Sequence, residues 1–91
     1  MKIEGWRSKP IENEVILTLV KNRGEMLTND LYRILNNTYQ DFGMPELMDL
    51  LFRLEVRSYI FVVQIKKDVW KIEINPKARL SDELMRQIKN I

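Results

Sequence analysis

The first third of the chain has apolar residues at helical spacing. One stripe runs along a single helical face between two punctuating residues, Pro10 and Gly24. Proline suits the first turn of a helix and glycine suits a left-handed stop, so the pattern predicts a helix between them. The stripe consists of Ile11, Val15, Ile16, Leu19 and Val20.

Two further helices are predicted before position 57. A short extended piece, 25–27, precedes a second helix that we expect Thr28 to cap, with Leu31, Ile34 and Leu35 facing inward. The stretch "NNTYQDFG" (36–43) is rich in turn formers and predicts a loop. A third helix is expected from near Pro45 to about Val56. Its apolar stripe is Leu47, Leu50, Leu51 and Leu54.

Alternation of apolar and polar residues after position 60 predicts a β-hairpin. A tight turn at Lys67-Asp68 pairs every inward residue of "FVVQIK" with an inward residue of "VWKIEI". The expected pairs are Phe61 with Ile74, Val63 with Ile72, and Ile65 with Trp70. The outward face is then expected to hold Val62, Gln64, Lys66, Lys71 and Glu73.

The last segment, "LSDELMRQIKNI", predicts a C-terminal helix capped by Ser81. This helix has one apolar side, which we expect to pack on its own domain. Dimerisation through the same side is the open alternative. The residues of this side are Leu84, Met85, Ile88 and Ile91.

Composition narrows the function classes. The 91 residues make one domain, and no apolar run approaches the roughly 20 residues needed to cross a membrane. Because the N-terminus lacks the apolar segment of a signal peptide, we expect a cytoplasmic protein. Cysteine and histidine are absent, and the three glycines are too dispersed for a nucleotide loop. We therefore expect no enzyme, no metal and no cofactor; the missing cysteines also fit a thermophilic source.

The element order is helix, short strand, helix, helix, hairpin, helix. It resembles the winged-helix domain, and the stretch "LLFRLEVRSYIFV" is similar to the end of that family's third helix and the start of its wing. The matching positions are Leu54, Glu55, Arg57, Ser58 and Ile60. Ser58 stands where the family usually has glycine, the loop before the third helix is long for the family, and the wing turn is short.

The resemblance covers residues 10–75 and implies an α+β, mostly helical fold. We expect a three-helix core with a β-hairpin wing over this range, an N-terminal segment at 1–9 and a C-terminal helix within 76–91. Winged helices bind DNA or RNA, and many serve only to dock other proteins, so the fold alone does not decide the function.

The outer side of the third helix is the first candidate site. In a DNA-reading member this side enters the major groove, where basic and amide side chains read the bases. Here it presents one acid, one cation (Arg53) and several apolar groups. The candidate protein-interaction residues are Pro45, Met48, Asp49, Phe52 and Val56. Three alternatives stay open: the C-terminal helix or the segment with Trp6 covers this side, another protein binds it, or nucleic acid does.

The excess of basic residues lies outside the third helix. Net charge is +2, and residues 61–91 carry seven basic against four acidic side chains. Lys66, Lys67 and Lys71 on the wing, with Arg53, are the candidate nucleic-acid contacts, although an ordinary solvated hairpin tip also explains these lysines. The leading hypothesis is a non-enzymatic accessory subunit that binds a larger protein in a DNA- or RNA-processing assembly. The alternative is a dimeric DNA-binding transcription regulator.

Overall fold

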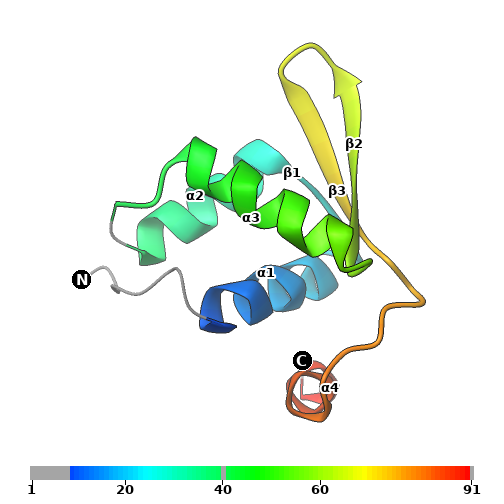
Figure 1. Ribbon diagram of the computed structural model, residues 1–91. Coiled ribbons are helices and arrows are strands. Elements are labelled where there is room, and N and C mark those ends of the chain that lie inside the picture. The colour runs from blue at the N-terminus through cyan, green and yellow to red at the C-terminus, as the bar shows by residue number, and fades with distance from the viewer. Residues whose placement is uncertain (1–8, 40, 91) are drawn as a thin grey trace.

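The computed structural model describes residues 9–39 and 41–90, which form four helices and a three-stranded sheet, an α+β arrangement (Figure 1). Its helices are α1 (Lys9–Lys21), α2 (Thr28–Thr38), α3 (Met44–Val56) and α4 (Asp82–Lys89). The strands β1 (Glu25–Leu27), β2 (Ile60–Lys66) and β3 (Val69–Ile74) make one antiparallel sheet in the order β1-β3-β2. The β2–β3 hairpin projects beyond the helices, and α4 lies next to α1, on the far side from the hairpin tip.

The end of α1 follows the sequence prediction. Gly24 has a φ of 90°, and its N–H donates to the Leu19 carbonyl at 2.7 Å, which closes the helix. The Gly24 carbonyl then accepts a hydrogen bond from the Ile74 N–H at 2.7 Å. One glycine therefore ends α1 and ties it to the last strand of the sheet.

The start of α2 differs from the prediction. Thr28 is not the cap but the first residue of the helix, where its side chain is buried. The N-cap is Leu27, the last residue of β1, and its apolar side chain makes no cap hydrogen bond. Ile34, predicted to face inward, is largely exposed.

The link between α2 and α3 is shorter than predicted, because α2 extends to Thr38. The Asn36 side-chain amide donates to the Phe42 carbonyl at 2.8 Å, which holds the link against the helix. The Glu46 carboxylate accepts from the Gly43 N–H at 2.8 Å and so fixes the first turn of α3.

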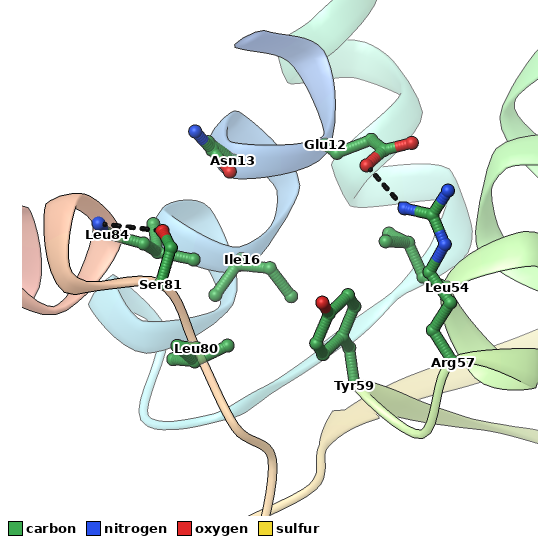
Figure 2. A pocket seen from close by; sticks show the side chains of 9 residues that line it. All are labelled: Glu12, Asn13, Ile16, Leu54, Arg57, Tyr59, Leu80, Ser81 and Leu84. Carbon is green, nitrogen blue, oxygen red and sulfur yellow. Dashed lines mark hydrogen bonds and ion pairs between the residues drawn. The ribbon is translucent and has the colours of Figure 1, made fainter. Parts of the chain in front are cut away.

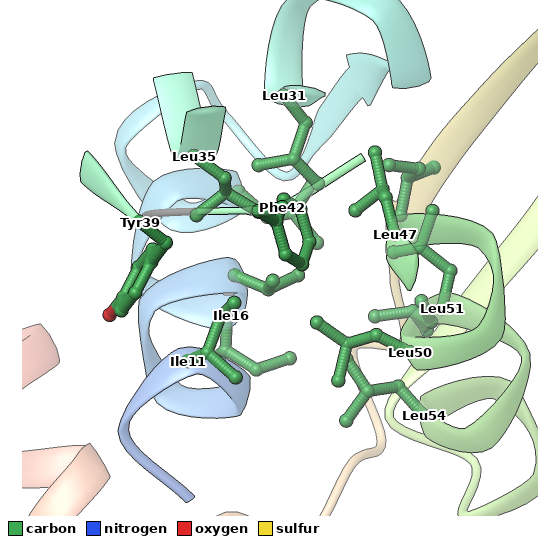
Figure 3. Packing of buried hydrophobic residues seen from close by; sticks show 14 of the residues in the cluster. Ile11, Ile16, Leu31, Leu35, Tyr39, Phe42, Leu47, Leu50, Leu51 and Leu54 are labelled. Carbon is green, nitrogen blue, oxygen red and sulfur yellow. The ribbon is translucent and has the colours of Figure 1, made fainter. Parts of the chain in front are cut away.

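The core lies between α1, α2 and α3, and the predicted α3 stripe is buried in it (Figure 3). Tyr39 and Phe42 enter the core from the α2–α3 link, and Leu84 enters from α4. The Ser81 hydroxyl accepts from the Leu84 N–H at 3.2 Å, so the predicted cap of α4 is confirmed. The stripe residues Leu47, Leu50, Leu51 and Leu54 are each at most 2% exposed.

The register predicted for the hairpin is wrong by one residue. The turn at Lys67-Asp68 is present and Lys66 pairs with Val69, but an irregularity between Gln64 and Lys66 places one extra residue in β2. The pairs below it are therefore Ile60 with Ile74, Val62 with Ile72, and Gln64 with Trp70.

This shift reverses the two faces of β2, because successive strand residues point to opposite sides. Ile60 is buried and Val62 packs against the core. Phe61 and Val63, predicted to point inward, lie on the outer face with about two fifths of their surface exposed (45% and 42%). Ile65, at the irregularity, is 53% exposed.

Candidate protein-interaction surface

The outer face of α3 remains open among the described residues. Val56 is 85% exposed and Phe52 is 43% exposed, and Asp49 and Pro45 are exposed as well. Met48 differs, because it is half-buried and packs against the core. The helix α4 packs against α1 instead of α3, so it does not cover this face. The segment with Trp6 lies outside the described residues.

Phe52 and Val56 lie in a shallow hollow on this face. The hollow has a volume of about 280 Å³. Asp49 and Arg53 pair across one helical turn, with Arg53 Nη2 at 3.3 Å from Asp49 Oδ2. We name this surface the α3 face; it is lined by Asp49, Phe52, Arg53, Val56 and Arg57.

Two contacts fix the α3 face relative to the rest of the fold. The Phe52 ring meets the Trp70 ring edge-on, with centroids 6.5 Å apart and an interplanar angle of 84°. At the other end, Arg57 Nη1 lies 2.9 Å from Glu12 Oε2 on α1. Sequence reasoning missed both contacts, because each joins segments far apart in the chain.

The Arg57–Glu12 ion pair also borders a second, smaller pocket, of about 180 Å³ (Figure 2). Ile16, Leu54 and Leu84 give it an apolar floor, and the segment leading into α4 closes one side. Ligand sites usually measure about 300–1,000 Å³. This pocket is smaller, and we interpret it as a packing seam between α1 and α4.

The candidate nucleic-acid contacts fall into two groups. Lys66 and Lys67 lie exposed at the hairpin tip, and neither has an ion pair within the described part of the chain. Arg53 is paired with Asp49. Lys71 Nζ lies 2.9 Å from Glu73 Oε1 and 3.5 Å from Glu25 Oε2.

The surroundings of Lys71 stabilise its charged form. The hydrogen bond and charge of Glu73, together with the charge of Glu25, raise the pKa of the Lys71 ammonium above its ordinary value of 10.5. Lys71 is thus charged at neutral pH, but its charge is already compensated by neighbouring carboxylates. A phosphate would have to compete with them.

The candidate dimerisation residues on α4 are mostly used within one chain. Leu84 is buried in the core and Ile88 packs against it, whereas Met85 is 41% exposed. Ile91 lies outside the described residues. The apolar side of α4 therefore contributes mainly to the fold of the single chain. Of its described residues, Met85 is the one left exposed for contact with a second copy.

Two further kinds of site were searched for in the described ranges 9–39 and 41–90. No group of three or more acidic side chains there is placed to hold a metal ion. No helix in these ranges is both long and apolar enough to span a bilayer. Comparisons of the chain with protein-family models, curated proteins and solved structures found no match.

Proposed function

We propose that this chain is a winged-helix protein-interaction module without enzymatic activity, and that it binds a larger protein through the α3 face. The order of the elements and the position of the hairpin after α3 support the winged-helix assignment. Ser58 supports it as well, because its φ of 65° is the left-handed conformation that favours glycine, the residue the family usually has there.

The observation that carries the proposal is the exposed apolar content of the α3 face. Val56 and Phe52 leave much of their surface in water, where contiguous apolar groups mark protein contacts more often than nucleic-acid contacts. An aromatic ring beside a well-exposed aliphatic residue is the kind of central anchor that protein interfaces use.

The charges of the α3 face disfavour duplex DNA. Asp49 would meet the phosphate backbone, which carries about one negative charge per 1.7 Å of duplex. Arg53 is the cation nearest to it, and it already pairs with Asp49. A protein partner is compatible with this compensated pair, because the interface then needs no net positive charge.

The kind of assembly rests on the family resemblance. Winged helices that dock proteins recur in machines that process DNA or RNA, and we place this chain as an accessory subunit in such an assembly in the cytoplasm. The partner itself is identified by the test below.

The test compares the proteins retained by tagged variants in a nuclease-treated lysate of the native cell. Val56→Asp is the main variant, because its side chain is the most exposed apolar group of the α3 face and its replacement leaves the core intact. Ile34→Asp on α2, with 41% exposure, is the matched control. We expect a discrete partner retained by the wild type and by Ile34→Asp but lost with Val56→Asp. Identical retention by all three proteins would contradict the proposal.

The DNA-binding alternative is favoured by one observation: Lys66 and Lys67 lie at the projecting hairpin tip and have no ion pair with another described residue. Its test is the double variant Lys66→Glu, Lys67→Glu in a duplex-binding assay at moderate salt. Clear sequence-specific binding that this variant abolishes, with retention unchanged by Val56→Asp, would favour the DNA-binding regulator over the interaction module.

A further inference from the structure

The β2–β3 hairpin exposes a second apolar surface, separate from the α3 face. Phe61, Val63 and Ile65 of β2 are each more than two fifths exposed, and Leu27 on β1 is 39% exposed. Between them, on β3, Lys71 is paired with Glu73 and Glu25. The largest exposed apolar groups of the sheet are therefore concentrated on β2, at its edge.

No strand of the described residues 9–39 and 41–90 lies beside that edge. β3 is the central strand, and β2 pairs with it on one side only. An exposed, apolar edge strand is a template for pairing with another strand, and proteins seldom leave one uncovered. The first four residues of β2 are all β-branched or aromatic, and the strand contains no proline.

Two hydrogen bonds show which backbone groups lie on the free edge. The Tyr59 carbonyl accepts from the Asn75 N–H at 2.9 Å, so its polar groups face the side of β3. The Val62 N–H donates instead to Glu55 Oε2 at 2.8 Å, on the side away from β3. Because these directions alternate along a strand, every second residue presents its N–H and carbonyl to the free edge. These residues are Ile60, Val62 and Gln64.

The hairpin is also electrically polar along its length. Lys66 and Lys67 outnumber Asp68 at its tip, whereas Glu73 and Glu55 lie near its base, beside the carbonyl end of α3. A second hairpin in the antiparallel direction brings each tip to the other's base. A parallel neighbour would place like charges together, so the charge distribution fits an antiparallel copy of the same strand.

We propose that two copies of this chain pair through β2, antiparallel and about a two-fold axis at Val63, to form a continuous six-stranded sheet. This inference does not rest on the proposed function, because it uses none of the residues of the α3 face.

The register follows from the pattern of the edge. A two-fold axis at Val63 places Phe61 opposite Ile65 of the second copy and Val63 opposite Val63, so each exposed apolar residue of β2 meets another. Aromatic and β-branched cross-strand pairs of this kind stabilise sheets. Val62 and Gln64 then exchange backbone hydrogen bonds with the second copy. In the single chain the Val62 N–H donates to the Glu55 carboxylate. In the dimer it donates instead to the Gln64 carbonyl of the second copy.

The first test measures molecular mass by sedimentation over a range of protein concentrations. We expect the wild type to approach twice the 11.0 kDa of one chain as concentration rises. Val63→Lys places two ammonium groups opposite each other at the axis and should raise the dissociation constant about ten-fold or more. Met85→Lys on α4, with similar exposure, should leave it unchanged. Circular dichroism confirms that both variants are folded.

The second test uses the absence of cysteine from the chain. Val63→Cys places two thiols in a directly opposed, non-hydrogen-bonded pair, where Cα atoms lie about 4.5 Å apart. Mild oxidation should link this variant into a covalent dimer much faster than Met85→Cys. A wild type that stays monomeric at all concentrations, a mass that grows beyond two chains, or equal cross-linking rates would each overturn the proposal.

Discussion

The α3 face and the outer face of the hairpin are both apolar and exposed, yet they offer a partner different things. In α3 the backbone polar groups are bonded within the helix, so only side chains such as Phe52 and Val56 are available. In β2 one side of the strand also presents backbone groups that are bonded to no other strand among the described residues, beside Phe61 and Val63. The helix face thus suits a partner with a shaped surface, whereas the strand edge suits another strand.

The two faces also differ in how firmly the fold holds them. Phe52 leans on Trp70 and Arg53 pairs with Asp49, so the α3 face is partly fixed before a partner arrives. The hairpin is held at its base by Ile60 and Ile72, while its tip projects away from the helices. The partly fixed α3 face favours selective recognition of a partner, and the free edge of β2 favours pairing with the same strand of a second copy.

The largest effect on the free energy of unfolding is expected when a buried side chain of the hairpin is compared with an exposed one. Ile72→Ala removes a fully buried side chain behind both exposed faces and should lower the free energy of unfolding by about 2–5 kcal/mol. Val63→Ala, on the outer face, should change it by less than about 1 kcal/mol. Urea unfolding at low protein concentration measures both. Comparable losses would mean that Val63 points inward after all.

A smaller effect is expected at the joint between the two regions. Glu55→Ala removes the carboxylate that accepts from the Val62 N–H and so unfastens the end of α3 from β2. We expect a loss of about 1–3 kcal/mol, the range for a partly buried hydrogen bond to a charged group. Glu55→Gln, which keeps an acceptor oxygen, should lose less, and chemical denaturation compares the two. Equal losses would show that side-chain packing matters here, not the hydrogen bond.

The contact between the two regions can be measured directly. A double-mutant cycle with Phe52→Ala and Trp70→Ala should give a coupling free energy of about 0.5–1.5 kcal/mol for the edge-on ring pair. Thermal or urea unfolding of the four proteins provides the values. A coupling indistinguishable from zero would mean that the α3 face and the hairpin are energetically independent.

The smallest effect concerns the ion pair on the α3 face. Asp49→Ala breaks the pair with Arg53, but both side chains are well exposed, so the free energy of unfolding should change by less than about 0.5 kcal/mol. The same variant leaves Arg53 uncompensated. Retention of the Asp49→Ala variant on a heparin column should therefore increase. Unchanged retention would show that Arg53 is compensated by another group.

The helices and the apolar stripe of α3 could be predicted from the sequence because both depend on local spacing. Leu47, Leu50, Leu51 and Leu54 share a helical face whatever the rest of the chain does, and all four are buried. The caps at Gly24 and Ser81 are equally local.

The strand register and the tertiary contacts were beyond local reasoning. The predicted pairing was self-consistent, with apolar residues opposite each other at every position. The irregularity between Gln64 and Lys66 shifts it by one residue, because Ile60 and Val62 must meet the helices. The ion pair between Arg57 and Glu12 spans 45 residues, and no spacing rule in the sequence connects those two positions.

The single extra residue in β2 separates two parts of the hairpin that obey different constraints. Below it, the core dictates which side chains turn inward; above it, the turn at Lys67-Asp68 sets the pairing. Deleting Ile65 would give both parts of the hairpin one regular pairing register. The base would stay anchored by Ile60, and Lys66 would stay opposite Val69, because the turn sets that pair. One inserted residue thus lets the pairing set by the core and the pairing set by the turn coexist in a single strand.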